Sequence, residues 1–294
     1  MRTVTAVAAF LLLTGFIRNV EERIERIAAE IDSTVGVAAL HIESGRRTGV
    51  RAGERFPMGS VYKLPIAVAF LREVDAGRFS LADEVTIDPA DFAPHHSPIR
   101  DAARGRPLTI TLRQAVEVMM GQSDNTAADL LLRLAGGGEA VTRVLREFGI
   151  SDIDITRPER EIATGPGDSA SPAAVLSLLE RIYTRQDGLS PPSRDLLLRI
   201  MSTSPTGQRR IKAGAPARAT VAHKSGTMPG TVNDAGIITS PDGRDHVLIV
   251  VFTTGGRTST MNQRERVVST ITRAVYRDFV GWSPFRRPSA RAER

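Results

Sequence analysis

TVAHKSGTMPGTVNDAGIITSPDGRDHVLIVVFT, residues 220–253, is the stretch that indicates the fold most directly. Its apolar, β-branched segments predict strands at Thr220–His223, Val232–Thr239 and His246–Thr253. The turn at Pro241-Asp242-Gly243 is short enough to join the last two strands as an antiparallel pair. We therefore expect an antiparallel sheet in this part of the chain.

Outward from this stretch, further strands and a helix are expected toward both ends of the chain. Residues 36–42 predict a strand, and the Ser44-Gly45 turn leads into a second strand that ends near Ala52. The apolar periodicity of Met261–Phe279 predicts a closing helix. The sheet should therefore combine segments from the two ends of the chain.

Between these sheet segments the apolar periodicity is helical. Thr111 and Gln114 have the spacing of a capping box, and Gly77 is placed to end a helix. Residues 78–110 contain four prolines and are expected to form loops. Helices are predicted over residues 60–75, 111–120, 125–135, 139–148, 172–184 and 191–202.

The order of elements predicts an α/β fold of the α+β type, with an antiparallel sheet flanked by helices plus an all-helical domain. Because the strands lie on both sides of the helical block, the sheet domain should be discontinuous. The expected boundaries are 20–60 and 205–281 for the sheet domain, 61–204 for the all-helical domain and 282–294 for a C-terminal tail. Residues 1–19 are expected to be a signal peptide or an N-terminal anchor.

The first residues have the pattern of an export signal. Met1-Arg2 supplies a positive charge before an apolar run from Val4 to Ile17, which is shorter than an ordinary membrane span. No small-x-small cleavage site follows, so an uncleaved anchor, a buried first helix and a mis-assigned start codon are alternatives. We expect an exported protein, periplasmic or secreted, without stable membrane contact after export.

Composition narrows the classes of function. The 294-residue chain has no cysteine, which excludes a disulfide scaffold, a catalytic thiol and a thiolate metal site. Its net charge is +6, but no basic run is interleaved with aromatic residues, so nucleic acid is not an expected partner. Arginine stays charged, whereas lysine can lose its proton in a buried site. The rarity of lysine therefore draws attention to Lys63, Lys212 and Lys224, the only three in the chain.

Two of these lysines lie in motifs that can carry chemistry. In Ser60-Val61-Tyr62-Lys63 the hydroxyl and the amine share a helix face, and an amine near other cations can activate a serine. Ser123-Asp124-Asn125 offers a hydroxyl and a carboxamide between two predicted helices. Lys224-Ser225-Gly226-Thr227 ends a predicted strand, where Gly226 permits close approach of a ligand. Each motif alone is common, but together they predict one site.

In this order the three motifs resemble the serine β-lactamase and penicillin-binding superfamily, in which they form a single site. The resemblance is closest to class A β-lactamases and extends from about Val20 to Phe279. It includes Ser123–Ala128, Asn233-Asp234 and the segment Arg157–Ile162. It implies a class A β-lactamase-like fold, a small-molecule β-lactam as substrate and a monomer.

The resemblance implies hydrolysis of the β-lactam ring of penicillin- and cephalosporin-type antibiotics through a serine acyl-enzyme, with no metal or organic cofactor. Ser60 would be the nucleophile and Lys63 its general base or part of the proton relay. Glu159 would activate the water that hydrolyses the acyl-enzyme. Ser123 would pass a proton to the ring nitrogen, while Lys224 sets the local field.

The same resemblance implies the residues that bind substrate. Asn125 would hold the substrate's side-chain amide, and Ser225 and Thr227 would bind its carboxylate beside Gly226. The backbone N–H groups of Ser60 and Thr227 would form the oxyanion hole. Arg210, at the start of the segment 210–216, matches an arginine that some family members use for the carboxylate; the alternative is a solvated surface charge.

Departures from the family pattern concern deacylation. Glu159 is followed by Arg160 instead of proline, and Ala163 stands where an asparagine helps to hold the deacylating water. We therefore expect intact acylation with hydrolysis that is slow or confined to some substrates. A penicillin-binding D,D-peptidase and a slowly deacylating β-lactam-binding protein are the alternatives, which Glu159 disfavours and Ala163 supports.

Histidines are a further point of interpretation. His95-His96 are expected to be structural or surface residues, because adjacent side chains point apart and no carboxylate lies at metalloprotease spacing. His223 could tune the charge of Lys224 or be a simple strand residue. The aromatic wall that the family places near residues 87–88 is missing from the sequence.

Overall fold

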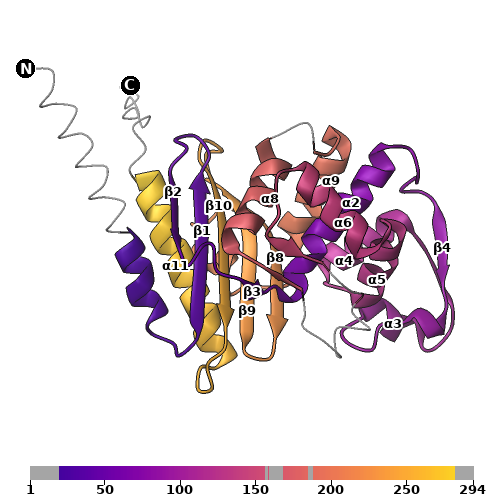
Figure 1. Ribbon diagram of the computed structural model, residues 1–294, viewed down its shortest axis with the longest axis horizontal. Coiled ribbons are helices and arrows are strands. Elements are labelled where there is room, and N and C mark those ends of the chain that lie inside the picture. Colours follow the sequence, from indigo (N-terminus) through magenta and orange to yellow (C-terminus); the bar gives the residue numbers. More distant parts are fainter. Residues whose placement is uncertain (1–19, 156–157, 159–167, 185–187, 282–294) are drawn as a thin grey trace, which may run out of the picture.

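The structure, a computed structural model, describes residues 20–155, 158, 168–184 and 188–281. At its centre is an antiparallel sheet of five strands in the order β2-β1-β10-β9-β8 (Figure 1). The strands are β1 (Thr34–His41), β2 (Arg47–Val50), β8 (Thr220–Met228), β9 (Thr231–Thr239) and β10 (His246–Thr254). The predicted antiparallel sheet is confirmed, with β8 at one edge.

The sheet joins the two ends of the chain. Val37 in β1 lies opposite both Val50 in β2 and Val251 in β10, so the N-terminal hairpin is completed by a strand more than 200 residues later. The strand predicted to end at His223 instead continues to Met228, because its pairing with β9 extends to the Met228–Thr231 pair. The Lys224–Thr227 motif therefore lies within this edge strand.

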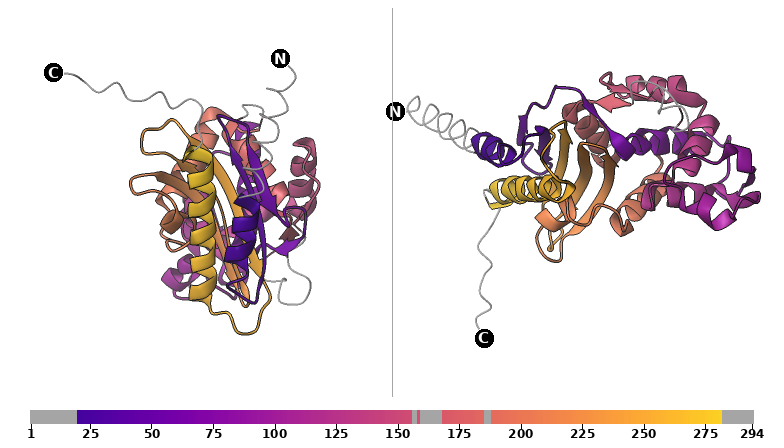
Figure 2. Two further views of the ribbon diagram at one scale, coloured as in Figure 1. Left: turned by 90° about the vertical axis from the view of Figure 1, so that its left-hand side faces the viewer. Right: turned by 90° about the horizontal axis from the view of Figure 1, so that it is seen from below.

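Each face of the sheet is covered by helices. The helix at residues 20–28 and α11 (Met261–Gly281) lie side by side on one face, and α8 (Pro172–Thr184) packs on the other (Figures 1 and 2). Alternate residues of β1 enter the two cores, with Val37 facing α11 and Ala38 facing the helical block. This period of two fixes which face of the sheet meets the helical block.

The helical block surrounds α2 (Lys63–Asp75). Residues 63–71 of α2 are all buried, because helices pack around it on several sides. A single 3₁₀ turn, η1 (Gly59–Tyr62), leads into α2 and contacts β8 and β9. The surrounding helices are α4 (Leu112–Gly121), α5 (Asn125–Leu134), α6 (Gly137–Glu147) and α9 (Pro191–Thr203).

The loop expectation for residues 78–110 is partly wrong. Strand β4 (Glu84–Ile87) pairs with β5 (Leu108–Thr111), and the prolines lie outside both strands. Pro98 occupies the first turn of α3 (Pro98–Ala103). Proline has no backbone N–H, and at this position an N–H would have no partner within the helix. The capping box of Thr111 and Gln114 is confirmed at the start of α4.

The remaining short elements connect the sheet to the helical block. Strand β3 (Phe56–Pro57) pairs with β7 (Ser169–Ala170), which also pairs with β6 (Ile153–Asp154). Helix α10 (Ile211–Gly214) packs against α11, while η2 spans Pro89–Asp91. Within the described ranges no helix is both long and apolar enough to cross a membrane.

Candidate active site

Side chains from the three sequence motifs form an unbroken row of hydrogen bonds. Ser60 lies in η1, and Lys63, the first residue of α2, donates to Ser60 Oγ at 3.0 Å and to Ser123 Oγ at 3.3 Å. From the edge strand β8, Lys224 Nζ reaches the same Ser123 Oγ at 3.0 Å. The row thus runs from Ser60 through Lys63 and Ser123 to Lys224 and places two amines on one hydroxyl.

Lys63 is completely buried. Its Nζ also donates to the Ser123 carbonyl at 3.0 Å and to Asn125 Oδ1. A hydroxyl within 3.0 Å of a buried amine has the geometry of a serine nucleophile and its general base.

Lys224 is also completely buried. Burial lowers its pKa well below the ordinary value, and the nearby charges of Lys63 and Arg210 lower it further, while Asp234 opposes the shift. Lys224 therefore gives up its proton more readily than a surface lysine does.

The Ser123 turn is held by the residue that follows it. Asp124 is the N-cap of α5 and accepts the backbone N–H of Ala127 at 2.9 Å, while its other oxygen accepts that of Ile99 at 2.9 Å. Ser123 itself has a left-handed backbone with φ of 63°. Such strain in a residue other than glycine is typical of functional sites, because the surrounding bonds must maintain it.

Two glycines bring η1 and β8 into direct contact. A Cβ on Gly226 would lie 2.5 Å from the Met58 carbonyl and 3.0 Å from the Ser60 nitrogen. A Cβ on Gly59, which has φ of +52°, would lie 3.2 Å from the Thr227 nitrogen. The absence of a side chain at both glycines therefore lets the backbone of η1 lie directly against that of β8, at Ser60 and Thr227.

Arg210 is buried behind β8, so the surface-charge alternative is wrong. Its guanidinium donates to Thr227 Oγ1 at 2.6 Å and to the Gly226 and Asn233 carbonyls at 2.9 and 3.0 Å. Glu265 of α11 accepts from its Nε at 3.2 Å. This network fixes a positive charge directly beside the Thr227 hydroxyl.

A cavity of about 580 Å³ opens in front of these groups. Ser225, which also lines it, donates to Thr206 Oγ1 at 2.9 Å. The predicted residues in its lining are Ser60, Ser123, Asn125, Arg210, Ser225 and Thr227. Glu159 and Ala163, which were predicted to govern deacylation, lie outside the described residues.

The sequence interpretation missed part of the cavity wall. Residue 87 ends β4 and is buried in the core, whereas His95 and His96 line the cavity. His96 is tied to the Ser123 turn, since its Nε2 bonds the Gln122 carbonyl at 2.9 Å and its own carbonyl accepts the Asn125 N–H at 3.1 Å. These contacts join segments about 25 residues apart, and no local motif signals them.

Comparison with known proteins agrees with this geometry. A model of the β-lactamase enzyme family matches residues 19–279. The chain belongs to this family. Together with the serine–lysine site, the relatives place it among the class A serine β-lactamases.

Individual relatives span nearly the whole of this β-lactamase. It is 31% identical to β-lactamase VEB-1 of Pseudomonas aeruginosa, over 88% of this chain and 89% of that protein. The crystal structure of a β-lactamase from Chitinophaga pinensis superimposes with a TM-score of 0.82 at 36% identity, covering 88% of this chain and 98% of that one. A class A β-lactamase structure from Bacteroides cellulosilyticus gives 0.83 at 25% identity, covering 90% and 99%.

The activity of the chain is hydrolysis of the β-lactam ring, the chemistry of antibiotic resistance in this family. The three relatives described above are all named β-lactamases, and none of them supports the D,D-peptidase alternative. The predicted family, fold and reaction are confirmed.

Proposed function

We propose that Ser60 is the nucleophile of this β-lactamase. Its Oγ attacks the carbonyl carbon of the β-lactam ring, forming a new C–O bond while the ring C–N bond breaks. The hydroxyl proton passes to Lys63, directly or through the water held by Glu159, and is returned through Ser123 to the departing ring nitrogen. The unbroken row Ser60–Lys63–Ser123–Lys224, with every step between 3.0 and 3.3 Å, is the observation that carries this proposal.

The remaining groups bind and stabilise the substrate. The amides of Ser60 and Thr227 would donate to the oxyanion, where one donor is worth about 2.7–4 kcal/mol. Ser225, Thr227 and Arg210 would hold the substrate carboxylate, while Asn125 would hold its side-chain amide. The bond from Arg210 to Thr227 Oγ1 supports this division of roles, because it leaves the cation next to the hydroxyl that meets the carboxylate.

Deacylation is assigned to Glu159, which would activate the hydrolytic water. Because Ala163 offers no hydrogen bond to that water, hydrolysis should be slower than acylation or confined to some β-lactams. The carbonyl of Asp168, nine residues after Glu159 in the sequence, accepts the backbone N–H of Met58 at 3.0 Å, two residues before Ser60.

An intact-mass time course with a penicillin tests the proposal. The unaltered protein should gain one substrate mass and lose it as the drug is consumed, whereas Glu159→Ala should keep the adduct for hours. Ser60→Ala should form no adduct. An adduct on Ser60→Ala would overturn the assignment of the nucleophile, and rapid turnover by Glu159→Ala would overturn that of the base.

We also propose the cellular setting and organisation expected from the sequence. The protein would be exported, periplasmic or secreted, through the segment 1–19, and would act as a monomer without stable membrane contact. The sheet domain would comprise 20–60 and 205–281 and the all-helical domain 61–204, with the cavity between them. Light scattering tests whether the protein is a monomer, and fractionation of the expressing cell tests export and membrane contact.

A further inference from the structure

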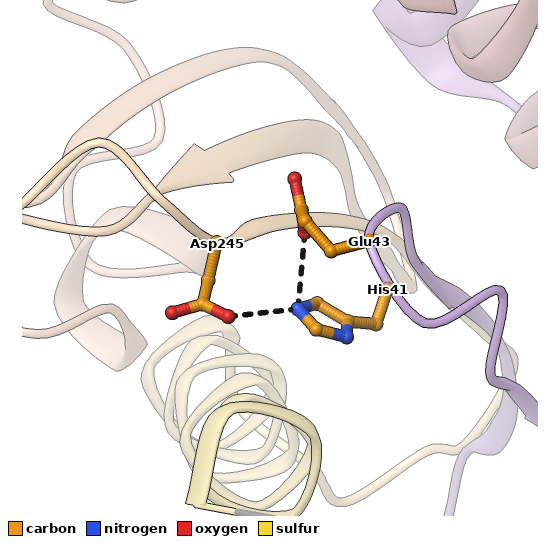
Figure 3. A group of neighbouring side chains, drawn as sticks. All are labelled: His41, Glu43 and Asp245. Atoms are coloured by element: carbon orange, nitrogen blue, oxygen red, sulfur yellow. Dashed lines mark hydrogen bonds and ion pairs between the residues drawn. The ribbon is translucent and has the colours of Figure 1, made fainter. Parts of the chain in front are cut away.

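A second cluster of chemically active side chains lies far from the cavity. His41 ends β1, Glu43 follows in the next turn, and Asp245 directly precedes β10 (Figure 3). In the sheet register His41 pairs with Val247, near the start of β10, whereas Thr227 aligns with the far end of that strand. The cluster therefore occupies the end of the sheet opposite the Thr227 amide.

The three side chains converge on one point. Both carboxylates reach the same ring nitrogen, with Glu43 Oε2 and Asp245 Oδ1 each 3.1 Å from His41 Nε2 (Figure 3). All three atoms lie within 4.8 Å of one another. Ligand atoms about this far apart can share one Zn²⁺, because Zn–N and Zn–O bonds are about 2.0–2.2 Å long.

The orientations of His41 and Glu43 are each fixed by a second contact. His41 Nδ1 lies 2.7 Å from Ser44 Oγ, and the ring stacks on Phe279 with centroids 6.0 Å apart. Glu43 Oε2 accepts the backbone N–H of His246 at 2.9 Å. A histidine whose remaining ring nitrogen donates to an oxygen, beside a carboxylate held by a backbone amide, is the arrangement that orients protein metal ligands.

Charge balance also favours a cation at this point. Glu43 Oε1 is already paired with His246 Nδ1, whereas Glu43 Oε2 and Asp245 Oδ1 face His41 Nε2. When His41 Nδ1 donates to Ser44 Oγ, the lone pair of Nε2 repels these two oxygens, and a proton or a metal ion on Nε2 removes that repulsion. A metal ion, unlike a proton, can bond all three atoms at once. The His41 side chain is buried at 1% exposure, but that of Glu43 is 28% exposed, which leaves a path for an ion.

We propose that His41, Glu43 and Asp245 form a binding site for a divalent transition metal of the Zn²⁺ type, with water as the fourth ligand. The ion would link the turn after β1 to the turn before β10, two segments about 200 residues apart in the sequence. Its role would be structural, since the β-lactamase reaction takes place at the other end of the sheet.

Calorimetric titration of the chelator-treated full-length protein with Zn²⁺ tests the site. One equivalent should bind and raise the unfolding temperature, and Co²⁺ in its place should give the visible spectrum of a four- or five-coordinate site. Glu43→Gln keeps the size of the side chain and an acceptor for the His246 amide, yet should weaken Zn²⁺ binding at least tenfold. Glu54→Gln, an exposed carboxylate outside the cluster, is the matched control.

A joint His95→Asn and His96→Asn variant separates this site from the histidines of the cavity. Zn²⁺ binding that persists in this variant and is lost in Glu43→Gln supports the proposal. Binding that persists in Glu43→Gln, or no binding to the unaltered protein, overturns it. Turnover of a penicillin by Glu43→Gln at the rate of the unaltered protein shows that this variant is folded.

Discussion

The carboxylate of Asp234 lies 2.9 Å from His223 Nδ1. Both side chains are buried, on the adjacent strands β9 and β8, and His223 directly precedes Lys224. The same carboxylate accepts the backbone N–H of Ile211 at 3.1 Å, next to Arg210. His223 is thus a member of a buried hydrogen-bonded network that includes Asp234 and the backbone of Ile211. Asp234 connects the position of Arg210 with the charge of Lys224, whose pKa it raises against the effect of burial.

Asp234→Asn should change the pH dependence of catalysis. Without the carboxylate, the protonated form of Lys224 loses a favourable charge, so the pKa of Lys224 falls further. If protonated Lys224 sets the field of the site, the alkaline limb of kcat/KM should move to lower pH. A pH profile with a penicillin measures the shift. Asp242→Asn, an exposed carboxylate, should leave the limb in place, and an unmoved limb in Asp234→Asn contradicts the prediction.

Arg210→Ala should raise KM much more than it lowers kcat. Loss of a hydrogen bond to a charged group costs about 1.5–3 kcal/mol, equivalent to about 10- to 150-fold in KM for carboxylate-bearing substrates. Steady-state kinetics measures this split. Arg209→Ala is the matched control, because Arg209 also pairs with Glu265, at 2.8 Å, but is exposed. Equal effects of the two substitutions would show that Arg210 acts only through Glu265.

Lys224→Met should remove a pH-dependent cost from folding. The pKa of Lys224 is lowered in the folded protein, so between that pKa and the unfolded value of about 10.4 the unfolded chain binds more protons. The contribution of Lys224 to the free energy of unfolding should therefore increase as pH rises from the folded pKa to the unfolded pKa. Urea unfolding at several pH values should show this gain in the unaltered protein and a smaller one in Lys224→Met. The same pH dependence of the free energy of unfolding in both proteins would contradict the prediction.

Gly226→Ala should impair acylation more than folding. The added Cβ would meet the Met58 carbonyl at 2.5 Å and displace η1 from β8, separating the Ser60 and Thr227 amides. A displacement of about 1 Å can cost about 100-fold in rate. Stopped-flow acylation measures the loss. Gly53→Ala, where a Cβ meets open space, should acylate normally, and full activity of Gly226→Ala would contradict the predicted contact.

Most of the fold could be predicted because its signals are local. The capping box at Thr111 and the apolar periods of α8 and α11 lie within single segments. The end of β8 could not be placed in this way, because Gly226 and Pro229 disfavour a strand and only pairing with β9 extends it. Strand β4 likewise could not be predicted, because it lies in the proline-rich segment 78–110 and forms by pairing with β5.

In the site, too, contacts within one turn could be predicted from the sequence, whereas contacts between distant segments could not. Ser60 and Lys63 share one turn, so their contact at 3.0 Å follows from spacing alone. The burial of Arg210 depends on Glu265, and the placement of His96 depends on the Ser123 turn, contacts that span 55 and 26 residues. Tertiary contacts of this kind leave no local pattern.

The position of β1 between β2 and β10 has a consequence for biosynthesis. Val247, the partner of His41 across the sheet, is synthesised 206 residues after His41. At about 5–20 residues per second this interval lasts about 10–40 s. During that time the growing chain already contains the Ser60 motif, but β1 lacks β10 and Ser123 lacks Lys224. A chain that ends before residue 224 would therefore contain Ser60 but lack Lys224, the second amine on the Ser123 hydroxyl.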